Sequence, residues 1–255
     1  MKKTLLVISL LFSLSFSLSF AETAEEYFTQ ADKLYQAEKY EEAVELYTQA
    51  IKINPTDSKA HFNRGLSYAR LKQLESAIQD YNKAIELNPN EPDYFYRRGN
   101  SYRNLKQYDK AIADYTKAVE LKSDNPDFYN NRGISCHDLK QYDKAIGDYI
   151  KAIELNPNNP SYFYNRGISY RNLNQYNKAI GDYTKAIELK SNEPHYFNNR
   201  GNSYGNLNPD DKAIADYTKA IDLSPNKPSY FYNRGISYYN LNQYDKAIAN
   251  YTQAI

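Results

Sequence analysis

Small and aromatic residues recur along the chain at one fixed interval. Six glycines lie one interval apart, at positions 65, 99, 133, 167, 201 and 235. A series of seven alanines begins at Ala43, and a tyrosine follows each of them four residues later. A fixed period of about 20 to 50 residues is typical of stacked repeat arrays. With the glycine numbered as position 8, seven units begin at residues 24, 58, 92, 126, 160, 194 and 228.

Each unit predicts two amphipathic helices. In unit five, Phe163, Gly167 and Tyr170 follow the i, i+4, i+7 spacing of one helix face. Ala179 and Tyr183 have the same i, i+4 spacing in a second helix. Proline opens units three to seven, where a helix start tolerates its missing N–H. Because two helices cannot bury both of their faces alone, neighbouring units must stack on each other.

Together these positions resemble the tetratricopeptide repeat family over residues 24–255. The matching features are the length of the period, an aromatic residue at position 4, Gly at 8, Tyr at 11, Ala at 20, an aromatic residue at 24 and Ala at 27. The resemblance implies an all-α, right-handed superhelical solenoid of helix-turn-helix units, whose concave surface is lined by the first helix of each pair. The expected units are residues 24–57, 58–91, 92–125, 126–159, 160–193, 194–227 and 228–255.

The chain departs from the family pattern at position 7, where arginine replaces the usual leucine in six units. These arginines are Arg64, Arg98, Arg132, Arg166, Arg200 and Arg234. Units two to six carry aspartate at position 23: Asp80, Asp114, Asp148, Asp182 and Asp216. Unit one lacks both members, with Gln30 and Leu46 in their places. We therefore expect an ion pair in each of these five units; two independently solvated charges are the alternative. Unit six departs again at position 17, where Asp210 follows Pro209.

Residues 1–21 have the pattern of a secretory signal peptide. Two lysines precede an apolar run from Leu5 to Phe20, and the small residues Ser19 and Ala21 follow the cleavage rule. Cleavage is expected between Ala21 and Glu22. The alternative is an uncleaved membrane anchor, but the run of about 16 residues is shorter than the roughly 20 that span a bilayer. We expect an exported bacterial protein of the periplasm or cell envelope, or a secreted one, with no stable membrane insertion after cleavage.

Composition and charge exclude several classes of protein. Removal of Lys2 and Lys3 with the signal peptide leaves a formal charge of −1, which gives no electrostatic footprint for nucleic acid. The only cysteine, Cys136, cannot form an intrachain disulfide, and it occupies a position where other units place a core tyrosine. The three histidines occupy three different positions of the unit, and no metal-ligand or phosphate-binding motif is present. We expect no enzyme, no cofactor and no metal site.

The concave face is the candidate binding site. Its predicted groove residues lie at position 6, as Asn63, Arg97, Asn131, Asn165, Asn199 and Asn233, and at position 5, as Phe62, Tyr96, Tyr164 and Tyr232. We expect the asparagines to be exposed. A row of amides and rings suits an extended, uncharged peptide, because each amide both donates and accepts. The row is similar to the asparagine ladder in the repeat superhelix of O-linked N-acetylglucosamine transferase. A polar surface that is merely hydrated is the alternative.

Two further functions remain open beside a peptide-binding scaffold. The second helix of unit seven would expose an apolar face, formed by Ala247, Ile248, Tyr251 and Ile255, that favours self-association into a structural assembly. Tyrosine faces and amides also suit a cell-wall glycan. The sequence does not identify the partner.

Overall fold

The structure, a computed structural model, describes residues 22–255, so the predicted signal peptide at residues 1–21 lies outside the described residues. Residues 22–255 form fourteen α-helices and no strand, which confirms the all-α prediction. The helices are α1 Ala24–Gln36, α2 Tyr40–Ile53, α3 Ser58–Arg70, α4 Leu74–Leu87, α5 Pro92–Asn104, α6 Tyr108–Leu121, α7 Pro126–Asp138, α8 Tyr142–Leu155, α9 Pro160–Asn172, α10 Tyr176–Leu189, α11 Pro194–Asn206, α12 Asp210–Leu223, α13 Pro228–Asn240 and α14 Tyr244–Gln253.

Each helix pair is joined by a tight turn that the sequence repeats. In unit three, Lys106 has a φ of 58°, in the left-handed region. Its N–H donates to the carbonyl of Arg103 at 2.8 Å, and the N–H of Gln107 donates to the carbonyl of Tyr102 at 2.8 Å. These two bonds form a Schellman motif, which satisfies the last carbonyls of the first helix and reverses the chain.

The two helices of a unit approach closely because position 8 is glycine. A Cβ atom built on Gly167 would lie 2.8 Å from the ring of Tyr183, the tyrosine at position 24 of the same unit. The Tyr183 side chain is fully buried, as are its counterparts in the other internal units to within a few per cent. The repeated glycine therefore leaves the space that the repeated tyrosine fills, as the sequence indicates.

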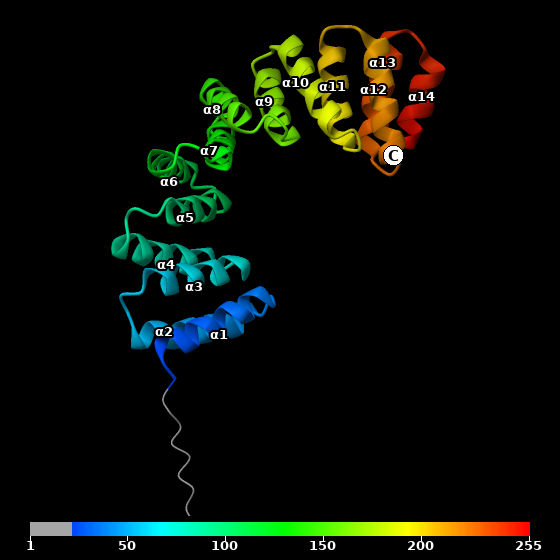
Figure 1. The fold of residues 1–255 in the computed structure, drawn as a ribbon. Coiled ribbons are helices and arrows are strands. Elements are labelled where there is room, and N and C mark those ends of the chain that lie inside the picture. Colours follow the sequence, from blue (N-terminus) through cyan, green and yellow to red (C-terminus); the bar gives the residue numbers. More distant parts are fainter. Residues whose placement is uncertain (1–21) are drawn as a thin grey trace, which may run out of the picture.

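The array is curved, with the first helices on its inner side (Figure 1). Successive first helices contact each other, α1 with α3, α3 with α5 and so on to α11 with α13, whereas in residues 22–255 no two successive second helices do so. First helices that lie closer together than second helices give a solenoid whose concave face is lined by α1, α3, α5, α7, α9, α11 and α13.

The predicted ion pairs are confirmed in units two to six. Arg166 donates from Nε and Nη2 to the two carboxylate oxygens of Asp182, at 2.8 and 2.7 Å. The side chains are only 18% and 8% exposed, so the pair is better shielded from water than a surface pair. The hydrogen bonds to Asp182 raise the pKa of the Arg166 guanidinium. In unit seven, Asn250 takes the place of the aspartate and accepts from Arg234 Nε at 2.8 Å.

Candidate functional site

The position-6 asparagines lie in a row on the concave face, and each one bonds to the preceding unit. In units five and seven the partner is another amide: Asn165 Nδ2 donates to Asn130 Oδ1 at 3.0 Å, and Asn233 Nδ2 donates to Asn198 Oδ1 at 3.0 Å. In unit two, Asn63 Nδ2 donates to Asp32 Oδ1 at 3.0 Å. The row therefore links consecutive first helices to each other.

Units four and six use a tyrosine and an arginine for the same link. Asn131 donates to the Tyr96 hydroxyl at 3.1 Å and accepts from Arg103 Nη1 at 2.7 Å. The same three residue types recur two units later, where Asn199 donates to the Tyr164 hydroxyl at 2.7 Å and accepts from Arg171 at 2.8 Å. From unit four to unit seven the polar surface thus alternates with a period of two units.

These hydrogen bonds show that the position-6 asparagines are less accessible than the sequence predicts. The five asparagines are half-buried, so the expectation that they are exposed is wrong; Arg97 of unit three and Thr29 of unit one are the exposed residues at this position. Their Nδ2 donors already have partners in the protein. The side-chain oxygens Oδ1 of Asn165 and Asn233 accept no hydrogen bond within residues 22–255, so these two oxygens remain available to a ligand.

The rings at position 5 pack mainly between units. Phe62 lies 4.6 Å from Tyr94, and Tyr96 lies 4.9 Å from Phe128, measured between ring centroids. Tyr164 packs on the next unit in the same way. Tyr232 is different, because 54% of its side chain is exposed. Three of the four predicted rings thus hold the stack together, while Tyr232 offers a free face.

Position 13 presents most of the open polar groups of the concave face, because every unit has a polar or charged residue there. Position 13 carries a row of exposed amides, namely Asn104, Asn172, Asn206 and Asn240. Four arginines accompany them: Arg70, Arg97, Arg103 and Arg171. Within residues 22–255 none of these four has an acidic partner within 4 Å, unlike the position-7 arginines of units two to six. The concave face therefore carries arginines without an ion-pair partner, and position 13 also carries one exposed carboxylate, that of Asp138 in unit four.

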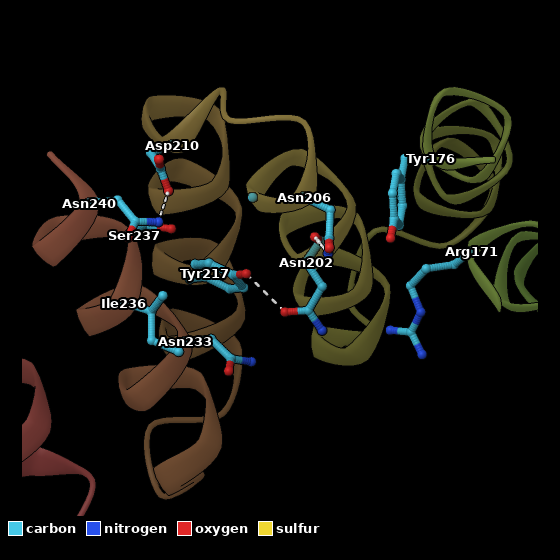
Figure 2. A pocket seen from close by; sticks show the side chains of 11 residues that line it. Arg171, Tyr176, Asn202, Asn206, Asp210, Tyr217, Asn233, Ile236, Ser237 and Asn240 are labelled. Atoms are coloured by element: carbon cyan, nitrogen blue, oxygen red, sulfur yellow. Dashed lines mark hydrogen bonds between the residues drawn. The ribbon is translucent and has the colours of Figure 1, made fainter. Parts of the chain in front are cut away.

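A pocket of about 480 Å³ opens on this face in unit six (Figure 2). Its walls include Arg171 and Tyr176 of unit five, and Asn202, Gly205 and Asp210 of unit six. Gly205 stands at position 12 and Asp210 at position 17. Units one, four and seven fill these two positions with rings, as in the pair of His137 and Tyr142 with centroids 5.2 Å apart. The pocket therefore exists because unit six has replaced two large side chains with small ones.

A second pocket of about 240 Å³ opens at the equivalent place in unit two. There position 12 is Ala69 and position 17 is Leu74, and Arg70 and Arg97 lie on the wall. Sequence reasoning chose positions 5 and 6 and did not select positions 12 and 17 as a site. The signal that could have found them is the departure of Ala69, Gly205 and Asp210 from the repeat.

We next consider the groups in residues 22–255 that could take part in catalysis or metal binding. Burial raises the pKa of the Cys136 thiol to about 11, so the thiol is protonated and unreactive near neutral pH. Burial lowers the pKa of the neighbouring His137 imidazole. Residues 22–255 contain no group of three or more His, Cys, Asp or Glu side chains placed to hold a metal ion. None of the fourteen helices has the length and hydropathy needed to cross a membrane.

Similarity to known proteins is strongest in the repeated unit. Two curated relatives, serine/threonine-protein phosphatase 5 from Homo sapiens and from Rattus norvegicus, are each 45% identical over 47 residues. That stretch is 18% of this chain and only 9% of the phosphatase, so the chain matches less than a tenth of these relatives.

Three solved structures are similar over most of the chain. YrrB, described as a TPR protein with an unusual peptide-binding site, is 27% identical with a TM-score of 0.62, over 70% of this chain and 92% of that one. The C-terminal part of a TPR repeat-containing protein from Cytophaga hutchinsonii has a TM-score of 0.76 at 24% identity, over 89% and 93%. A tetratricopeptide repeat protein from Parabacteroides merdae has a TM-score of 0.71 at 19% identity, over 91% of each chain. The last two show the fold alone.

Family models described as tetratricopeptide repeat or TPR repeat match most of the chain. The matched residues are 28–92, 80–113, 99–139, 126–159, 160–193, 210–242 and 230–255. With the fixed period of the sequence, the fourteen paired helices of residues 22–255 and the curved stack, they lead to one conclusion. The chain belongs to the tetratricopeptide repeat family.

Proposed function

We propose that the protein is a non-catalytic scaffold that binds an extended peptide segment of a partner protein along its concave face. The observation that carries this proposal is the row of polar side chains at position 13 of every unit, with pockets beside it in units two and six. A continuous polar row can meet the backbone of an extended chain, and pockets can take individual side chains. The likeness to YrrB, a TPR protein described as having a peptide-binding site, supports the proposal.

The open groups fit a segment with acidic side chains better than an uncharged one. The exposed amide of Asn104 can donate to a peptide carbonyl, and Asn165 and Asn233 keep side-chain acceptor oxygens for peptide N–H groups. Each such bond is worth about 0.5–1.5 kcal/mol. The groove arginines that lack an acidic partner within residues 22–255 add charge-assisted bonds to carboxylates, which are stronger than neutral ones.

Export to the bacterial periplasm or cell envelope is part of the same proposal. Its support is the signal-peptide pattern of residues 1–21. N-terminal sequencing of the protein from envelope material should return Glu22 as the first residue. A first residue of Met1 would contradict both cleavage and export.

Peptide selection tests the binding. Random dodecapeptides displayed on phage are selected on residues 22–255, which contain every described helix, and an enriched peptide is titrated by fluorescence anisotropy. Replacing Arg103 and Arg171 together by Gln should weaken that peptide at least about tenfold. The matched control replaces the exposed Lys117 and Lys185, on second helices, by Gln, which changes the charge equally and should leave affinity unchanged. Failure to enrich any peptide, or an equal loss in the control, would contradict concave binding.

Self-association through α14 is the second candidate, and exposed apolar side chains favour it. Ile248 is 63% exposed, whereas its counterpart in unit four, Ile146, is 8% exposed beneath the following unit. Tyr239 and Tyr244 on the same last unit are also more than half exposed. Such an open face favours docking of a second copy. Sedimentation equilibrium should show concentration-dependent association that Ile248→Lys abolishes; a strict monomer at high concentration would exclude it.

A further inference from the structure

The carboxylate of Asp210 differs from every other buried aspartate in residues 22–255. The others are Asp80, Asp114, Asp148, Asp182 and Asp216, and each one binds an arginine of its own unit. Asp210 is equally buried, with 6% exposure, but no cationic group of the described residues lies within 4 Å of it. Its one hydrogen bond comes from Asn240 Nδ2 and is long, at 3.4 Å.

An unpaired buried carboxylate is unfavourable unless something completes it. A carboxylate can accept about four hydrogen bonds, and burial without a counter-charge is costly. Asp210 is the first residue of α12, where the helix dipole stabilises negative charge, but no backbone N–H of α12 is capped by a side chain. The carboxylate lines the pocket of unit six, so a ligand that enters the pocket can reach it.

The other residues that line the pocket indicate which chemical groups a ligand would need. Tyr217 and Ile236 supply apolar surface that can hold a hydrocarbon stem, while Asn202 and Asn206 supply amides. Figure 2 shows Arg171 at the opposite side of the pocket from Asp210, with Asn202 and Asn206 between them. Arg171 is held in place by its bond to Asn199 at 2.8 Å. The pocket therefore has an acidic end and a basic end.

We propose that the unit-six pocket takes a lysine or arginine side chain of the bound peptide, with Asp210 as its counter-ion and Arg171 facing an acidic neighbour in the peptide. The assignment rests on the proposed peptide binding and names its specificity. A long basic side chain places its stem between Tyr217 and Ile236 and its charge at Asp210. An acidic side chain at that end meets the Asp210 carboxylate and is repelled.

Peptide selection on three proteins tests the assignment: the wild-type chain from residue 22 onward, Asp210→Asn and Asp211→Asn. Asp211 is the matched control, because it is the exposed neighbour of Asp210 in α12 and its replacement changes the charge equally. Wild type and Asp211→Asn should enrich peptides with a basic residue. In one enriched peptide, replacing that residue by Gln should weaken binding at least about tenfold to both proteins, but less than about twofold to Asp210→Asn.

Gly205→Arg provides a second variant, since it fills the pocket with the residue that unit five has at position 12. It should lose the preference for a basic residue while circular dichroism shows unchanged helix content. Enriched peptides without a basic residue, or an equal loss of affinity in Asp210→Asn, would overturn the pocket assignment and leave concave peptide binding intact. If no peptide is enriched on any of the three proteins, the proposed function and the pocket assignment both fall.

Discussion

The pockets of unit two and unit six are built on the same positions of the repeat, yet they differ in size and charge. Both open where position 12 is small, with Ala69 in one and Gly205 in the other. The residue at position 17 then determines the polarity of the pocket lining: it is the apolar Leu74 in unit two and Asp210, with a buried carboxylate, in unit six. One scaffold thus presents two different sites through single departures from its repeat.

Unit five shows the closed form of the same place. Arg171 and Tyr176 occupy positions 12 and 17 there, and Arg171 bonds to the next unit instead of leaving space. The helices, the glycine and the ion pair beneath are alike in all three units. The repeated residues therefore determine how the two helices of a unit pack, while the side chains at positions 12 and 17 determine what each unit can bind.

The substitutions with the largest expected effect on stability test whether the helix pairs of units two and six are held together in the same way. Arg200→Ala leaves the buried carboxylate of Asp216 unpaired and should lower the free energy of unfolding by about 3 kcal/mol. Arg64→Ala should cost no more than this, because His61 Nδ1 still lies 3.7 Å from the Asp80 carboxylate. Urea denaturation followed by circular dichroism measures the loss. Lys185→Ala removes an exposed pair and should cost within about 0.5 kcal/mol. A clearly larger loss for Arg64→Ala than for Arg200→Ala would mean that the two units are not stabilised in the same way.

The glycine at position 8 gives the next effect. A Cβ on Gly65 or Gly201 would lie 2.8 Å from the ring of Tyr81 or Tyr217, so Ala at either site should overpack the core and cost about 1–3 kcal/mol. Gly181 is the control, because a Cβ there meets nothing within 4 Å. Gly181→Ala should stabilise by about 0.5–1 kcal/mol through helix propensity. A stabilising Gly201→Ala would refute the close-contact account.

Filling the pockets should separate stability from binding. Gly205→Arg removes a glycine from a helix and should stabilise the chain by about 0.5–1 kcal/mol, while it blocks the unit-six pocket. Ala69→Arg fills the unit-two pocket and should leave stability within about 0.5 kcal/mol. Thermal unfolding measures both. Strong destabilisation of either variant would show that the space is not open.

Cysteine labelling probes the open space with the smallest perturbation. Ala69→Cys and Gly205→Cys should each react rapidly with a thiol reagent at about pH 8. Cys136 is the internal control: burial raises its pKa to about 11, so it should react only slowly in the folded protein. The reaction rate of each cysteine is measured from the absorbance of the aromatic thiolate that a disulfide reagent releases. Equal protection of Cys136 and the introduced cysteine at 205 would contradict an open pocket.

The packing of the two helices within each unit was predictable from the sequence, because it depends only on contacts inside one unit. The period placed Gly167 against Tyr183 and Arg166 near Asp182, and both pairings follow from two antiparallel helices. The links between units were not predictable in the same way. Asn165 meets Asn130 in the preceding unit, and that register depends on how far each unit rotates on its neighbour.

The pockets lie between these two cases. The departures at Pro209 and Asp210 were visible as breaks in the repeat. That they mark a cavity becomes evident only when positions 12 and 17 are seen to face one space, together with Arg171 from the preceding unit. Position in a repeat thus predicts a residue's direction, but not the volume left when a neighbour shrinks.

Backbone amide NMR of residues 22–255 with an enriched peptide tests concave binding most directly. The largest shift changes should fall on the first helices, around Gly205, Asn206 and Ala69, while the outward residues Lys117 and Lys185 of the second helices stay unchanged. Changes confined to α14 or to the second helices would contradict the account.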